Sequence, residues 1–306
     1  MKLLNLTNSD LISFPKEIVE YDQLETLYLD QNCITHIPEN ISRLTRLKKI
    51  SLYDNHLNDL PSSFFAMENL EAVNLSANKM VSFSENISQL KNLQIWDIQH
   101  NQLTELPESL GNLRKLRFLY LGGNKLQTLP KTFENLKNLL YLNLTYNQFA
   151  SLPDSLGKLS NLIELRLYKN QLRSLPETLS KLAQLKELYV MENQLTQLPL
   201  SIGKLTNLRK LMLENNRLNT LPASIGDLKK LTDLDLRSNQ ITHLPESIGQ
   251  LKALRFLDLR ANQLSELPAT LQKLNKLEKL DLRLNKSLLL PDWLPKIEQQ
   301  GCTVFV

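Results

Sequence analysis

Apolar residues recur along this chain in a fixed frame of 23 residues, built around an asparagine. Apolar side chains lie eight, five and three positions before the asparagine, and two, five, nine, twelve and fifteen positions after it. In one unit these residues are Leu116, Leu119, Leu121, Leu126, Leu129, Phe133, Leu136 and Leu139, around Asn124. The asparagine returns without insertion or deletion, at Asn32, Asn55, Asn78, Asn101, Asn124, Asn147, Asn170, Asn193, Asn216, Asn239, Asn262 and Asn285. A fixed period of this length predicts a solenoid, in which each unit buries its apolar face only against its neighbours.

The spacing changes within each unit and so predicts two kinds of element. The apolar positions just before the asparagine alternate with a polar one, which is the period of a short strand. The later apolar positions have a helical period and indicate a short α or 3₁₀ segment. A proline six positions after the asparagine begins that segment, where its missing N–H costs nothing. Pro130 is an example, and only Ser84 breaks this column.

The asparagine is expected to hold the buried turn together. Its side chain can donate and accept, so it can satisfy backbone groups of its own and the next repeat. A leucine there would leave those groups unpaired, at about 1–3 kcal/mol each. A second column, beside the outer segment, contains glycines where we expect space to be tight: Gly111, Gly157, Gly203, Gly226 and Gly249.

These residues resemble the leucine-rich repeat family, with the pattern L-x-x-L-x-L-x-x-N-x-L-x-x-L-P-x-x-I-x-x-L-x-x-L. The match covers residues 1 to about 300 and is similar to the type found in bacterial repeat proteins and intracellular Ras-group scaffolds. The resemblance implies an α/β solenoid, a curved horseshoe with a parallel β-sheet on its concave face and short α or 3₁₀ segments on its convex face. We expect residues 1–306 to form one domain of about 13 repeats, with 291–306 as a C-terminal cap that includes a last edge strand at 303–306.

Composition and charge change this picture little. The net charge is +4, with the basic excess in the second half, which we interpret as solvated lysines on the outer face. Alternatively, the basic excess could attract an acidic partner or a phosphate-rich surface. Cys33 and Cys302 lie about twelve repeats apart and are not expected to pair, which favours a reducing compartment. The chain starts in repeat register rather than with a signal peptide, and no stretch approaches ~18 apolar residues. We therefore expect a cytoplasmic monomer with no membrane span; secretion into a host cell without a cleaved signal peptide is the alternative.

Function is expected from strand positions that the core does not use, four and two before each asparagine. In the middle repeats these positions gather aromatic residues, methionine and arginine, residue types that are enriched at protein interfaces. Tyrosine also suits strands in general, but a cluster on one exposed face of a sheet favours a binding patch. The candidate partner-binding residues are Tyr120, Arg166, Tyr168, Tyr189, Met191 and Met212, with Tyr146 beside them and Glu214 at their border.

The last three full repeats carry a repeated Asp-Leu-Arg at the same positions, beginning at Asp235, Asp258 and Asp281. One interpretation is a polar strip that docks a charged segment, which would add Arg237 and Arg260 to the partner-binding set. The other, which we favour, is a ladder of cross-strand ion pairs that satisfy one another, each contributing about 0.2–1 kcal/mol.

No catalytic or metal-binding pattern accompanies the repeats. The four histidines lie in different repeats without a cysteine at metal-ligand spacing, and Asp97 and His100 have no nucleophile placed with them. Gly122-Gly123 lacks the lysine and hydroxyl residue of a phosphate loop. We therefore expect a non-catalytic protein-interaction module, with no cofactor, metal or nucleic acid, that binds a protein or peptide on its concave face. A bacterial effector that binds host proteins, or the recognition part of a larger signalling scaffold, is the alternative.

Overall fold

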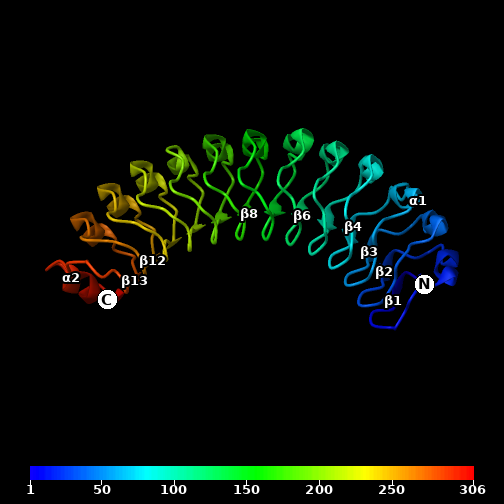
Figure 1. The fold of residues 1–306 in the computed structure, drawn as a ribbon, viewed down its shortest axis with the longest axis horizontal. Coiled ribbons are helices and arrows are strands. Elements are labelled where there is room, and N and C mark those ends of the chain that lie inside the picture. Colours follow the sequence, from blue (N-terminus) through cyan, green and yellow to red (C-terminus); the bar gives the residue numbers. More distant parts are fainter. The chain divides into compact units, whose positions relative to one another are not determined.

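The computed structural model describes residues 1–306, which divide into two compact units, Met1–Gln148 and Phe149–Val306. In each unit, short parallel strands line one side, and short segments, nearly all 3₁₀, line the other (Figure 1). The strands follow one another in chain order, so every repeat contributes one strand and one outer segment, and a last strand ends the chain. The predicted α/β repeat solenoid is confirmed, and the joining of all repeats into one domain stays a prediction.

In the first unit, consecutive strands pair in parallel. The middle residue of a strand points into the core: Leu27, Ile50 and Leu119 are fully buried. Its strands are β1 (Leu3–Asn5), β2 (Thr26–Tyr28), β3 (Lys49–Ser51), β4 (Ala72–Asn74), β5 (Ile95–Asp97), β6 (Phe118–Tyr120) and β7 (Tyr141–Asn143). Its outer segments are η1 (Lys16–Glu20), η2 (Glu39–Arg43), α1 (Ser62–Phe65), η3 (Glu85–Gln89), η4 (Glu108–Asn112) and η5 (Lys131–Asn135).

The second unit repeats the arrangement and ends on a short helix and a strand. Its strands are β8 (Glu164–Arg166), β9 (Glu187–Tyr189), β10 (Lys210–Met212), β11 (Asp233–Asp235), β12 (Phe256–Asp258), β13 (Lys279–Asp281) and β14 (Thr303–Phe305). Its outer segments are η6 (Asp154–Lys158), η7 (Glu177–Lys181), η8 (Ile202–Lys204), η9 (Ala223–Asp227), η10 (Glu246–Gln250), η11 (Ala269–Lys273) and α2 (Leu294–Gln299). Strand β14 pairs with β13 at the place where a last strand was expected; that residues 291–306 act as a cap stays a prediction.

Proline and leucine set the ends of the outer segments. Pro107 precedes η4 with extended backbone angles, φ −65° and ψ 145°, and Leu113 ends it with its N–H bonded to the carbonyl of Leu110. The few residues between these two points leave room for the tight i→i+3 bonds of a 3₁₀ turn. Where proline is missing, the Ser84 hydroxyl accepts a hydrogen bond from the Asn86 N–H, 3.2 Å away, and so caps η3.

The asparagine column lies inside the turns, where its members are only 3–9% exposed. The Asn147 amide donates to three carbonyls, those of Leu121, Leu144 and Thr145, at 3.0, 3.1 and 3.1 Å. Its carbonyl oxygen accepts from the N–H of Leu126, 2.9 Å away. Two of these partners belong to the preceding repeat. We expected the asparagine to bond backbone groups of its own and the next repeat. That direction was wrong: the asparagine bonds its own turn and the turn of the preceding repeat.

Cys33 is exposed and Cys302 buried, and both are free thiols. Burial raises the pKa of the Cys302 thiol to about 11, which keeps it protonated and unreactive at neutral pH. Neither of the two α-helices nor any 3₁₀ segment has the length and apolar character needed to cross a bilayer.

Candidate functional site

The strands of the second unit present two residues each on one face of the sheet. In β8, β9 and β10 the middle residue is buried and the flanking two are partly exposed. The second flanking residue is the position four before the asparagine, as predicted. The first flanking residue lies six positions before the asparagine and shares the same face. This position was not identified as exposed from the sequence. The alternation of period two, continued two residues upstream, would have revealed this column: Glu164, Glu187, Lys210, Asp233, Phe256 and Lys279 in this unit.

Tyr189 is held in place by two side chains of its own face. The Arg166 guanidinium lies 5.2 Å from the centre of its ring, and the Tyr189 hydroxyl donates to the Glu187 carboxylate. Glu164 fixes the arginine in turn, with 2.6 Å between its Oε1 and the Arg166 Nε. Burial and the bond to Glu187 raise the pKa of Tyr189, so the phenol stays neutral. The ring is thus oriented before any partner arrives.

The neighbouring predicted residues continue this face. Strand pairing places Tyr189 between Arg166 and Met212 along the same row. Tyr168, Met191 and Glu214 form the row two residues further along the chain, and all are partly exposed. In the second unit, the set that the structure brings together is Arg166, Tyr168, Tyr189, Met191, Met212 and Glu214; we call it the tyrosine–methionine patch.

Tyr120 and Tyr146 belong to the first unit. The Tyr120 ring packs on Tyr141, with 4.8 Å between ring centres. Tyr146 is not on a strand: it directly precedes Asn147 in the left-handed turn position, with φ 52°, and is 47% exposed. The turn therefore presents Tyr146 beside the strand residues, and its contact with a partner stays a prediction.

The Asp-Leu-Arg repeats of the second unit form ion pairs within the face. Arg260 Nη2 lies 2.6 Å from the Asp258 carboxylate, and Arg283 Nη2 lies 2.7 Å from that of Asp281. Arg237 contacts its own Asp235, 3.1 Å away, and also Glu214, 2.6 Å away. These contacts favour the interpretation as a ladder that satisfies itself. The expectation of cross-strand pairs was right only in part, because each Asp–Arg pair lies within one repeat, and only Arg237 with Glu214 and Arg260 with Asp281, 3.4 Å away, join neighbouring strands. Contact of Arg237 and Arg260 with a partner stays a prediction.

Asp281 is the most enclosed member of this ladder. Burial alone would raise its pKa, but the hydrogen bond from Arg283 and the charge of Arg260 outweigh that and hold the pKa below its usual range. Lys279 adds a third cation, 3.8 Å away, and both Lys279 and Arg283 lie about 5 Å from the ring centre of Phe305 on β14. The last strand is therefore attached to the ladder by side chains as well as by its backbone.

The pKa of Asp235 is raised, whereas that of Asp281 is lowered, and this difference leads to a testable prediction. Burial raises its pKa from 3.8 to about 6, assisted by the charges of Asp258 and Glu214 and opposed by the N–H and charge of Arg237. Between these values the folded state binds the proton more tightly than the unfolded state, so stability falls as the pH rises through this window. The penalty is complete above about pH 6 and absent below 3.8.

Asp235→Asn should therefore raise the free energy of unfolding at pH 7 by about 1–2 kcal/mol. The gain should fade as the pH falls from 6 towards 4, because the wild-type carboxyl is then protonated in the folded protein. Urea unfolding at several pH values measures this. A variant that is less stable than wild type at pH 7, or that gains equally at pH 4, would contradict the assignment.

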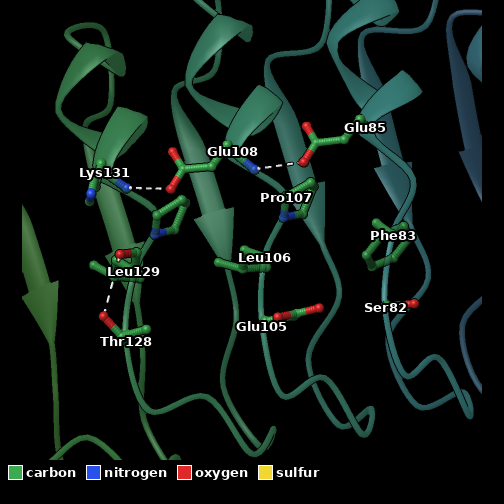
Figure 2. A pocket seen from close by; sticks show the side chains of 11 residues that line it. Ser82, Phe83, Glu85, Glu105, Leu106, Pro107, Glu108, Thr128, Leu129 and Lys131 are labelled. Carbon is green, nitrogen blue, oxygen red and sulfur yellow. Dashed lines mark hydrogen bonds between the residues drawn. The ribbon is translucent and has the colours of Figure 1, made fainter.

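A groove of about 470 Å³ runs along the side of the first unit, between the asparagine turns and the outer segments (Figure 2). Its floor is apolar, formed by Phe83, Leu106 and Leu129 with two prolines, and its rim holds Glu85 and Glu108. Figure 2 shows each of these carboxylates accepting a backbone N–H from the next repeat, Glu85 from Glu108 at 3.2 Å and Glu108 from Lys131 at 3.0 Å. These glutamates cap the following 3₁₀ segment, a role that sequence reasoning missed although an acidic residue recurs directly after the proline position.

Hydrogen bonding keeps these capping groups ionised. The hydroxyl of Ser109 and the backbone N–H groups beside it lower the pKa of Glu85, and the N–H groups of Lys131 and Thr132 lower that of Glu108. In the second unit the Ser201 hydroxyl and the N–H groups of Leu200 and Ser201 do the same for Glu177. Because the same contact recurs in both units, we assign it to the scaffold rather than to a ligand site. No group of three or more His, Cys, Asp and Glu side chains is arranged to hold a metal ion.

Comparison with known proteins places this geometry in a family. Models described as leucine rich repeat match residues 45–103, 206–264, 23–44 and 115–136, and a leucine-rich repeat region model matches 131–234. A leucine-rich repeat protein of Leptospira interrogans is 30% identical; the match covers 99% of this chain and 95% of that chain, with a TM-score of 0.63. No curated protein sequence matches the chain.

Two further solved structures differ in how much they imply. The plant peptide hormone receptor RGFR1 in complex with RGF2 is 30% identical over 88% of this chain, with a TM-score of 0.78, but the chain spans only 45% of that receptor. An internalin of Listeria monocytogenes is 22% identical over 93% of this chain and 87% of its own, with a TM-score of 0.79. At that identity the internalin shows the shared fold alone.

Proposed function

The chain belongs to the leucine-rich repeat family, and from that premise we propose that it is a non-catalytic interaction module that binds a protein or peptide on its strand face. The observation that carries the proposal is Tyr189, oriented by Arg166 and Glu187 at the centre of the tyrosine–methionine patch. The family fold is typical of binding scaffolds, and the plant receptor relative is a complex with RGF2. The partner of this chain is accordingly a protein or a peptide.

The chemistry of the patch supports binding. Tyrosine and arginine dominate binding energy when they are held rigidly and buried by a partner, because they offer much surface and lose little entropy. Met191 and Met212 add flexible apolar surface that adapts to a partner's shape. At the edge of the patch, Glu214 forms an ion pair with Arg237. Polar groups of this kind form the rim around the apolar centre of a protein interface. The charges of the neighbouring Asp-Leu-Arg ladder are paired with one another. The ladder therefore contributes more to the choice of partner than to the binding affinity.

Two cellular settings fit this surface. The free thiols of Cys33 and Cys302 support a cytoplasmic module in a reducing compartment. The second setting, an effector that binds a host protein after delivery into the host cell, needs the same kind of exposed strand face. Capture of partners from lysates of the native organism and of host cells, followed by mass spectrometry, separates the two settings by which lysate supplies the partner.

Binding of the captured partner then tests the surface. Tyr168→Ala and Tyr189→Ala should each weaken binding by about ten- to thirty-fold, which is roughly 1–2 kcal/mol. Both side chains project from the sheet between buried leucines, so neither change disturbs the core. Tyr168→Ala should keep the melting temperature within about one or two degrees of wild type. Tyr189→Ala also loses the Arg166 contact and the bond to Glu187, so it should cost about 1 kcal/mol, or roughly 2–4 degrees. Isothermal titration calorimetry and thermal unfolding give the two numbers.

Lys181→Ala is the matched control, because Lys181 is exposed at the end of η7, on the side away from the strands. This variant should bind like wild type. If the tyrosine variants bind normally and Lys181→Ala does not, the partner occupies the outer side and the proposal is wrong.

A further inference from the structure

A depression of about 350 Å³ in the strand face of the first unit holds a carboxylate that no cation neutralises. Asp97 lies in it at the end of β5, with apolar walls from Ile95 and Ala72 and the ring of Tyr120. Its hydrogen bonds come only from Gln99, from the backbone N–H at 3.1 Å and the side-chain amide at 3.3 and 3.4 Å. No lysine, arginine or histidine nitrogen lies within ion-pair distance of it, although the more distant His100 has some influence on its charge.

The second unit shows what is missing beside Asp97. Asp235, Asp258 and Asp281 occupy the same position of the repeat, and in each case an arginine two residues later pairs with the carboxylate. Arg260 does so with both Nε, at 3.0 and 3.1 Å, and Nη2, at 2.6 Å. The residue two positions after Asp97 is Gln99 instead of an arginine. Its amide oxygen already accepts a hydrogen bond from the Asn143 side chain, at 2.8 Å. The position that a guanidinium fills in three other repeats is therefore left to a neutral amide.

The surroundings of Asp97 suit a long cationic side chain. Ile95 is 40% exposed and, with the small Ala72, offers apolar surface to the methylene groups of such a side chain. The Tyr120 ring lies at the same depression, and aromatic faces attract guanidinium groups. Lys49 also lines the depression, but its ammonium lies 5.0 Å from the ring centre of Tyr28, not at the carboxylate. Burial raises the pKa of Asp97, against the hydrogen bonds from Gln99, as expected for a carboxylate that lacks a counter-charge.

We propose that this depression is a subsite for an arginine side chain of the partner, whose guanidinium would bind Asp97 as Arg260 binds Asp258. The inference rests on the proposed function, because it assumes that the strand face receives a protein or peptide. Arginine fits better than lysine because its planar fork matches a carboxylate with two parallel hydrogen bonds, which a single ammonium cannot make.

The test uses the full chain and two defined probes. These are the capped pentapeptide Gly-Leu-Arg-Leu-Gly and its twin with citrulline, a neutral isostere of arginine. Titration followed by NMR of the ¹⁵N-labelled protein should show shifts centred on Asp97 and Ile95 with the arginine peptide. The citrulline peptide should bind about tenfold more weakly or worse, because a charge-assisted hydrogen bond is lost.

Two variants make the test specific. Asp97→Asn should lose at least about tenfold in affinity for the arginine peptide. Gln99→Arg should lose as much, because it restores the Asp-x-Arg pattern and fills the subsite from within the chain. Equal binding of the two peptides to wild type, or unaltered binding to Gln99→Arg, would overturn the inference.

Tyr168→Ala separates this inference from the function on which it rests. Tyr168 lies in the second unit, so this variant should bind the arginine peptide like wild type while it binds the captured partner more weakly. If the peptides are not distinguished but Tyr168→Ala still weakens the partner, the arginine subsite is wrong and the proposed function stands. If Tyr168→Ala binds the partner normally, the proposed patch fails whatever the peptides do.

Discussion

Replacing Asn147 by leucine should lower the free energy of unfolding by about 2 kcal/mol or more. The Asn147 side chain supplies four hydrogen bonds to backbone groups inside the turn, three as donor and one as acceptor. A leucine has a similar size but can make none of them, so buried carbonyls and the Leu126 N–H lose their partners. Each unpaired buried group costs about 1–3 kcal/mol, and partial relaxation of the turn keeps the sum below the largest estimate.

Urea unfolding followed by circular dichroism measures this loss. Gln148→Leu is the control: it introduces the same residue one position later, at an exposed site where only a contact with Gln127 is lost. That variant should change stability by less than about 0.5 kcal/mol. An Asn147→Leu protein that unfolds at the wild-type urea concentration would mean that the asparagine column does not hold the turns.

Replacing Gly157 by alanine should lower the free energy of unfolding by about 2–3 kcal/mol. A Cβ atom at Gly157 would lie 2.2 Å from the carbonyl oxygen of Thr178 and 2.8 Å from its carbonyl carbon. Both atoms are backbone of the adjacent outer segment, so no side-chain rotation relieves the clash, and the two segments must move apart. The predicted tight column is confirmed at all five glycines, where an added Cβ would approach a neighbouring backbone oxygen to 2.2–2.4 Å.

Thermal and urea unfolding of Gly157→Ala give the size of this effect. Ser180→Ala is the matched control, because Ser180 occupies the same column in the next repeat and already has a Cβ atom. It loses only an exposed hydrogen bond from its hydroxyl to the Glu177 carbonyl, so stability should change by less than about 0.5 kcal/mol. Equal stability of Gly157→Ala and wild type would show that the outer segments are not packed as closely as described.

The sequence was sufficient for the elements of the fold because the repeat fixes them locally. Alternation around Leu119, proline before each outer segment and the buried asparagine each follow from one unit and recur in the others. The direction of the asparagine's bonds did not follow. A strictly periodic pattern has a neighbour at the same spacing on either side, so spacing alone cannot say whether Asn147 reaches back to Leu121 or forward.

Two further features were missed for a different reason. The first strand column varies from Lys49 to Ile95, Glu164 and Phe256, so a search for constant residue types passes over it, although it shares the exposed face. The capping role of Glu85 and Glu108 depends on a carboxylate reaching into the next repeat, which requires knowing how the repeats are stacked. The candidate site could be predicted as residues on a face, but not the contacts that orient Tyr189 or the unfilled position beside Asp97.

Photo-crosslinking from the strand face tests the central claim most directly. Benzoylphenylalanine would replace Met191, within the tyrosine–methionine patch, in one protein and Lys181, on the outer side, in another. Irradiation with the captured partner should yield a crosslinked complex from position 191 and none from position 181. Crosslinking from position 181 alone would place the partner on the outer segments and contradict the assignment of the strand face as the binding surface.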